Sequence, residues 1–94
     1  MGMKISYQKM TNADEAFARA RSVITPEYIE KFQVKAELHY DDAAKKVMAR
    51  GTGFTLVLTF LQDHCDLDLD LSFLLKPLKG KIMEKLEAQI KKNL

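Results

Sequence analysis

The sequence FTLVLTFLQDHCDLDLDLSF at residues 54–73 decides the fold, because it holds two alternating apolar runs around a short polar turn at 62–64. The first run, residues 54–61, is apolar on both faces and predicts a central strand that is the most covered of its sheet. The second run, residues 66–73, predicts a strand with one face in the core and one acidic face. Its core face carries Leu67, Leu69, Leu71 and Phe73, and its acidic face carries Asp66, Asp68, Asp70 and Ser72.

Residues upstream of this hairpin predict three more strands. Residues 4–10 alternate at period two and predict a short edge strand. A turn at 41–42 and a further strand around 47–49 lead to the Gly-Thr-Gly connection at 51–53, where glycine permits a tight turn. Residues 34–40 also alternate, with one face made of Val34, Ala36, Leu38 and Tyr40 and the other of Lys35, Glu37 and His39.

Helical spacing marks the two remaining regions of the chain. Asn12 and Glu15 have the spacing of a capping box, and they predict the start of a helix over residues 13–24. The pair Thr25-Pro26 predicts a second helical start, which continues to about Gln33. The last helix is predicted from about Pro77 to Asn93, with an apolar stripe of Leu78, Ile82, Leu86 and Ile90.

These elements predict one α+β domain over residues 1–94, in the order β-α-β-β-β-β-α with the N-terminal helical region split in two. An antiparallel meander of about four to five strands packs against that region and against the long C-terminal helix. This order resembles a shortened helix-grip domain, in which a curved sheet wraps a long last helix.

Composition excludes several classes of protein. A content of 47% hydrophobic and 30% charged residues is typical of a globular domain, and a net charge of +2 does not favour nucleic-acid binding. Cys65 is the only cysteine, so no intramolecular disulfide can form, which fits a reducing compartment. Because neither a signal peptide nor a membrane-spanning run is present, we expect a cytoplasmic protein.

No catalytic or metal-binding motif is present in the sequence. Asp66, Asp68 and Asp70 share a strand face and suit hard cations, but a strand spreads them in a line, which favours a solvated face. His64 and Cys65 lack zinc or nucleophile spacing and are expected to diverge, as a turn histidine and a structural cysteine. We therefore predict no enzyme activity, no metal and no cofactor.

The C-terminal region is basic. Residues 76–94 contain six lysines against two glutamates, a side-chain charge of +4. Lys76, Lys79 and Lys81 cluster at the predicted helix start, whose free N–H groups attract anions, and Gly80 would allow close approach of a ligand or another backbone. The alternative is a solvated lysine face.

The stretch LSFLLKPLKGKI at residues 71–82 resembles the C-terminal signature of the polyhydroxyalkanoic acid system (granule-region) family, and the similarity is strongest over residues 66–90. The resemblance implies a small cytoplasmic bacterial protein linked with polyester storage granules or their regulation. It implies no enzyme activity.

The leading hypothesis is therefore a binding protein whose partner is the polyester granule surface or a granule protein. Three consecutive apolar residues at 73–75 cannot all face one side of a strand, so at least one is expected to be exposed. Two alternatives remain, a helix-grip carrier of an acyl ligand held between helix and sheet, and a homodimer that completes a small core. The predicted interaction residues are Phe73, Leu74, Leu75, Lys76, Pro77, Lys79, Gly80 and Lys81.

Overall fold

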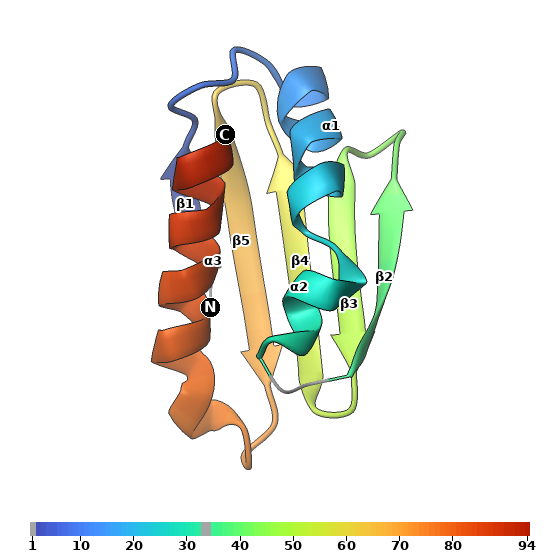
Figure 1. The fold of residues 1–94 in the computed structure, drawn as a ribbon, viewed down its shortest axis with the longest axis vertical. Helices are drawn as coiled ribbons and strands as arrows, with labels where there is room; N and C mark the ends of the chain where they lie inside the picture. The colour runs from blue at the N-terminus through green and yellow to red at the C-terminus, as the bar shows by residue number, and fades with distance from the viewer. Residues whose placement is uncertain (1, 33–34) are drawn as a thin grey trace.

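A computed structural model describes residues 2–32 and 35–94 and shows an α+β fold (Figure 1). The elements in chain order are β1 (Gly2–Ser6), α1 (Ala13–Val23), α2 (Pro26–Glu30), β2 (Ala36–Asp41), β3 (Lys46–Gly51), β4 (Phe54–Phe60), β5 (His64–Leu71), the 3-10 turn η1 (Lys76–Leu78) and α3 (Lys79–Asn93).

The strands form one antiparallel sheet in the order β1-β5-β4-β3-β2. β4 lies at its centre and β1 at one edge, so both placements predicted from the sequence are confirmed. Alternation sets the register, because Leu56 of β4 pairs with Leu69 of β5 and Ala49 of β3 on the same apolar face.

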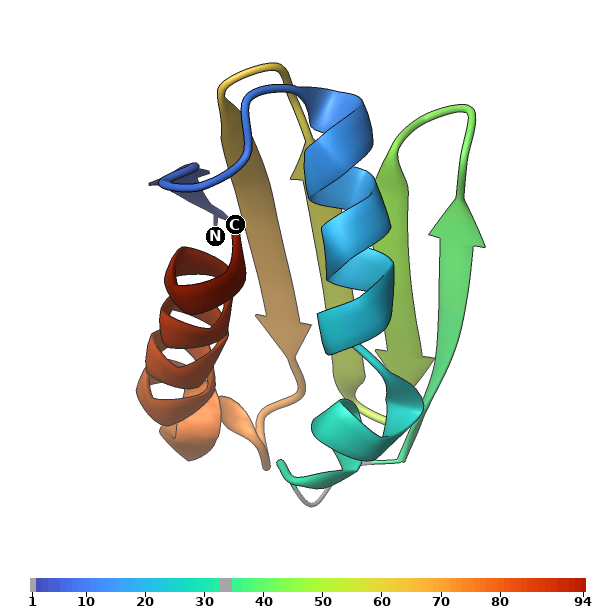
Figure 2. The ribbon, with the colours of Figure 1, turned by 45° about the horizontal axis from the view of Figure 1, so that its top comes forward.

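All three helices lie on one face of the sheet, which makes a two-layer domain (Figures 1 and 2). α3 contacts β1 and β5, and α1 contacts β3 and β4. The core between the layers contains, among others, Phe17, Ile24, Phe54, Leu58, Phe60, Leu67, Leu69, Ile82, Leu86 and Ile90. The Phe17 and Phe60 rings meet edge to face at 6.2 Å and join α1 to β4.

Side-chain caps fix the starts of the first two helices. The N–H of Glu15 donates to Asn12 Oδ1 at 2.9 Å, as the capping-box spacing predicts. The hydroxyl of Thr25 accepts the N–H of Tyr28 at 3.2 Å, and Pro26 occupies the first turn of α2, where its missing N–H costs nothing.

The buried stripe of α3 continues to the last residue. Ile82, Leu86, Ile90 and Leu94 are spaced by four, and each is at most 3% exposed. The backbone oxygen of Leu94 accepts N–H groups of Gln8, Lys9 and Met10 at 3.0, 2.6 and 2.7 Å. These bonds attach the end of α3 to the segment that follows β1.

Three predicted boundaries need correction. The first strand covers residues 2–6 rather than 4–10, because the N–H groups of residues 8–10 bond to the Leu94 oxygen and not to β5. β5 ends at Leu71, so Phe73 is not in the core. α2 ends at Glu30 rather than at about Gln33, and Gln33 and Val34 themselves lie outside the described residues.

β4 is the most covered strand of the sheet, as predicted, because it is the one described strand with no exposed residue. Thr55, Val57 and Thr59 are half-buried, whereas Phe54 and Phe60 on the opposite face are at most 2% exposed. The helices cover only the face that carries Phe54 and Phe60. The face that carries Thr55, Val57 and Thr59 is covered in part by neighbouring side chains of β3 and β5.

Candidate functional site

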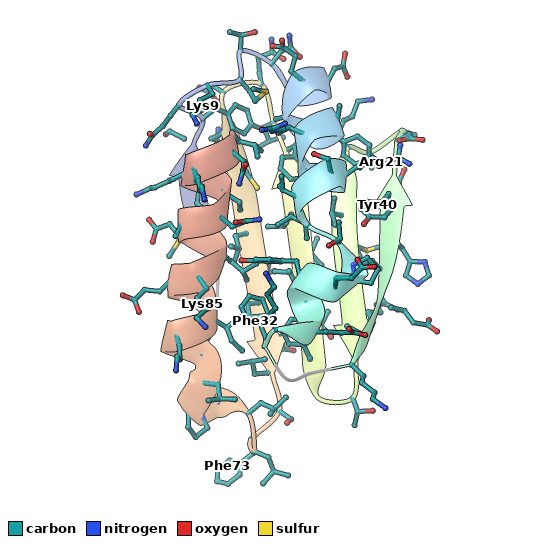
Figure 3. The ribbon with its side chains drawn as sticks, viewed as in Figure 1. Lys9, Arg21, Phe32, Tyr40, Phe73 and Lys85 are labelled. Atoms are coloured by element: carbon teal, nitrogen blue, oxygen red, sulfur yellow. The ribbon has the colours of Figure 1, made fainter. Side chains whose placement is uncertain are left out.

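The most exposed large apolar side chains of the described residues are at the end of β5. Phe73 is 85% exposed and Leu74 86% exposed, at a turn that leads into η1 and α3. Phe73 projects from this end of the molecule, away from the sheet and the helices (Figure 3). We call residues 72–75 the apical turn.

Hydrogen bonds hold the apical turn in shape. The N–H groups of Leu75 and Lys76 both donate to the carbonyl oxygen of Ser72 at 3.0 Å. The N–H of Ser72 in turn donates to the carbonyl oxygen of Gly53 at 2.8 Å, so the β3–β4 turn supports this one. Leu75 is half-buried against the core. The exposed pair is therefore presented by an anchored backbone.

The hydrogen bond from Ser72 to the β3–β4 turn requires a glycine at position 53. Its φ of +72° is strained for a residue with a side chain, and a Cβ there would lie 2.5 Å from Ser72 Oγ. The glycine predicted from the sequence to make a tight connection thus also leaves room for the apical turn.

Basic side chains continue directly from the apical turn. Lys76 and Lys81 are exposed and Lys79 is half-buried, and residues 71–83 contain no acidic residue. The N-cap position of α3, Leu78, provides no side-chain acceptor for the first N–H groups of the helix. This end of the molecule therefore combines apolar surface with positive charge.

Among the predicted interaction residues, Pro77 has a different setting from the one expected. Pro77 lies inside η1, where it stiffens the turn rather than starting the α-helix. Around Gly80, apart from its chain neighbours and the backbone of its own helix, no described atom lies within 4 Å of the place a Cβ would take, so the space there is open.

Leu78 is a residue that the sequence placed in the buried stripe of the last helix. It is 41% exposed, because α3 begins one residue later. Pro77 could have indicated this in the sequence, because a proline just before the helix allows a separate 3-10 turn there.

The acidic residues Asp66, Asp68 and Asp70 lie exposed along β5 on the sheet face that carries no helix. Within residues 2–32 and 35–94, no group of three histidine, cysteine or acidic side chains is arranged to hold a metal ion. Asp66 instead lies near His64, with 3.4 Å between Oδ1 and Nε2.

His64 and Cys65 lie next to each other on β5 but face opposite ways. His64 Nδ1 is 2.6 Å from Asp63 Oδ1, and this contact holds the pKa of the Asp63 carboxyl below its usual range. Cys65 is 0% exposed, and burial raises the pKa of its thiol to about 12. The two do not form a nucleophile and base.

Cys65 is expected to resist thiol reagents while the protein is folded. At pH 8 a pKa near 12 leaves roughly one thiol in ten thousand as thiolate, and the core blocks access. A colorimetric thiol assay should therefore detect no fast reaction in buffer and one thiol per chain in denaturant. Full labelling of the folded protein within minutes would contradict the burial.

No helix in the described ranges is long and apolar enough to span a bilayer. Residues 4–94 match a protein family described as "Putative polyhydroxyalkanoic acid system protein". Searches of curated proteins and of solved structures found no match.

Proposed function

We propose, from the premise that this chain belongs to the polyhydroxyalkanoic acid system family, that it binds the surface of polyester storage granules in the bacterial cytoplasm and catalyses no reaction there. The observation that carries the proposal is the exposure of Phe73 and Leu74 beside a cluster of lysines. Exposed apolar side chains that are held in place commonly mark interaction surfaces.

The chemistry of the apical turn suits a polyester. Such a polymer presents hydrocarbon groups, ester carbonyl oxygens and carboxylate chain ends. Phe73 and Leu74 can bury themselves against the hydrocarbon, while Lys76 and Lys81 can donate hydrogen bonds to the oxygens. The anchored backbone means that little conformational entropy is lost on binding.

The magnitudes agree with reversible attachment. Burying a phenylalanine or leucine side chain contributes about 1.5–3 kcal/mol each. Hydrogen bonds from the lysines to charged chain ends add about 1.5–3 kcal/mol each before losses of motion are subtracted. The apolar pair is therefore the larger part of the affinity for the neutral bulk of the polymer.

The carrier alternative needs a cavity between the last helix and the sheet. There Ile82, Leu86 and Ile90 of α3 meet Leu67 and Leu69 of β5, and each of these side chains is at most 3% exposed. That interface is packed core, which favours surface binding as the main proposal.

The test is co-sedimentation of the purified protein with polyester particles. Leu74→Asp should reduce binding by about a hundredfold. The substitution removes an apolar contact and would place a charge against the hydrocarbon of the polyester. The control is Ala43→Asp, which adds the same charge to an exposed residue of the β2–β3 turn. Equal binding by wild type and folded Leu74→Asp would disprove the proposal.

A further inference from the structure

We infer that the surface groove between α2 and α3 is a binding site for an amphiphilic carboxylate, such as a medium-chain fatty acid. Two adjoining hollows of about 190 and 250 Å³ form this groove, and Lys31, Phe32 and Lys85 line both of them. Phe32 and Lys85 lie on its two walls (Figure 3). The groove shares Lys81 with the proposed granule-binding surface but none of the residues of the apical turn.

The floor of the groove is largely apolar in the hollow lined by Tyr28, Phe32 and Ala88, and of mixed polarity in the other hollow. Its lining begins at Leu78 in η1 and continues along α3 from Lys81 past Ala88 to Lys92, a length of roughly 16 Å on the helix at the helical rise per residue. On the opposite wall Phe32, only 7% exposed, and Tyr28 pack their rings edge to face at 5.3 Å. Such a floor can accept an unbranched hydrocarbon chain.

The floor is also structurally fixed. The Tyr28 hydroxyl donates to the carbonyl oxygen of Lys85 at 3.2 Å, and Gln89 Nε2 donates to the carbonyl oxygen of Val23 at 3.2 Å. These bonds tie α3 to α2 and to the end of α1. A ligand would therefore meet a preformed groove.

The rim of the groove is basic. Its charged lining residues are all lysines, namely Lys31, Lys81, Lys85 and Lys92, and all are exposed. In the described part of the chain, no carboxylate pairs with any of these four, whereas Lys91 on the same helix pairs with Glu87 at 2.9 Å. The positive charge thus remains available to an anion.

The two features together select the ligand class. A free inorganic anion would leave the apolar floor unused, and a neutral hydrocarbon would leave the lysines unused. Each hollow is smaller than the roughly 300 Å³ of a typical ligand pocket, which favours a small ligand. A single acyl chain with an anionic end satisfies both the size and the charge.

The test is titration of ¹⁵N-labelled protein with decanoate, followed by amide chemical shifts, below the concentration at which decanoate forms micelles. Saturable shifts are expected at Tyr28, Lys85, Ala88 and Gln89. Each CH₂ that enters the groove should strengthen binding about fourfold, so octanoate, which is two CH₂ groups shorter, should bind roughly fifteenfold more weakly. Decanol, which lacks the charge, should also bind at least tenfold more weakly.

The matched variants are Lys31→Glu combined with Lys85→Glu, and Lys91→Glu as the control outside the groove. The double variant should lose at least twentyfold in decanoate affinity, and the control should stay within twofold. Decanol binding as tightly as decanoate, shifts centred elsewhere or no saturable binding would each overturn the inference. Leu74→Asp should bind decanoate normally, so failure here is distinguishable from failure of granule binding.

Discussion

Replacing both Phe73 and Leu74 by serine is expected to weaken binding to polyester particles by at least a hundredfold. The side chains are 85% and 86% exposed, so their removal takes away apolar surface that is buried only when the protein binds. At about 1.5–3 kcal/mol for each side chain, the loss is about 3–6 kcal/mol if both are fully buried. This loss is measured as a change in the binding constant, obtained by sedimentation over a range of particle concentrations.

The double variant should fold normally, because substitutions at exposed positions usually change stability by about 0.5 kcal/mol or less. Its control is Ala43→Ser with Ala44→Ser, a pair of exposed residues in the β2–β3 turn. If the folded double variant binds within threefold of the wild type, the apical turn is not the binding surface.

Leu86→Ala is expected to have the largest effect on stability, a loss of about 3–4 kcal/mol. Leu86 is 0% exposed in the middle of the α3 stripe, so truncation removes apolar contacts and leaves a cavity. A domain of this size has about 5–15 kcal/mol of stability in total, so the variant is left only marginally folded.

Urea unfolding measures this change as a lower midpoint with an unchanged slope. Lys85→Ala, the exposed neighbour on the same helix, is the control and should shift the midpoint little. A loss of less than about 1 kcal/mol in Leu86→Ala would mean that α3 does not pack on the sheet as described.

The sheet could be predicted from the sequence because each strand has an alternating pattern that one buried face dictates. Residues 54–61 were placed at the centre, and β4 is there. The pattern failed at the end of β5, where Phe73 continues the alternation but Ser72 donates its N–H to Gly53. A hydrogen bond to a residue in another turn does not change the alternation of apolar and polar residues, so the sequence pattern could not reveal it.

The candidate site was predictable in part, again from the alternation of side chains along a strand. Three apolar residues in succession at 73–75 predicted that at least one would be exposed, and the structure exposes Phe73 and Leu74. The groove was not predictable, because Lys31 and Lys85 come from distant segments that only tertiary packing brings together. The lysine-rich helix was visible in the sequence, but its partner wall was not.

The most direct test of the central claim is an environment-sensitive fluorophore attached at Phe73→Cys and, in a second protein, at Ala43→Cys. Because Cys65 is buried with a thiol pKa near 12, the introduced cysteine should be the one that reacts. On addition of polyester particles, a blue shift at position 73 with none at position 43 is the predicted result. Binding without a shift at position 73, or an equal shift at position 43, would contradict attachment through the apical turn.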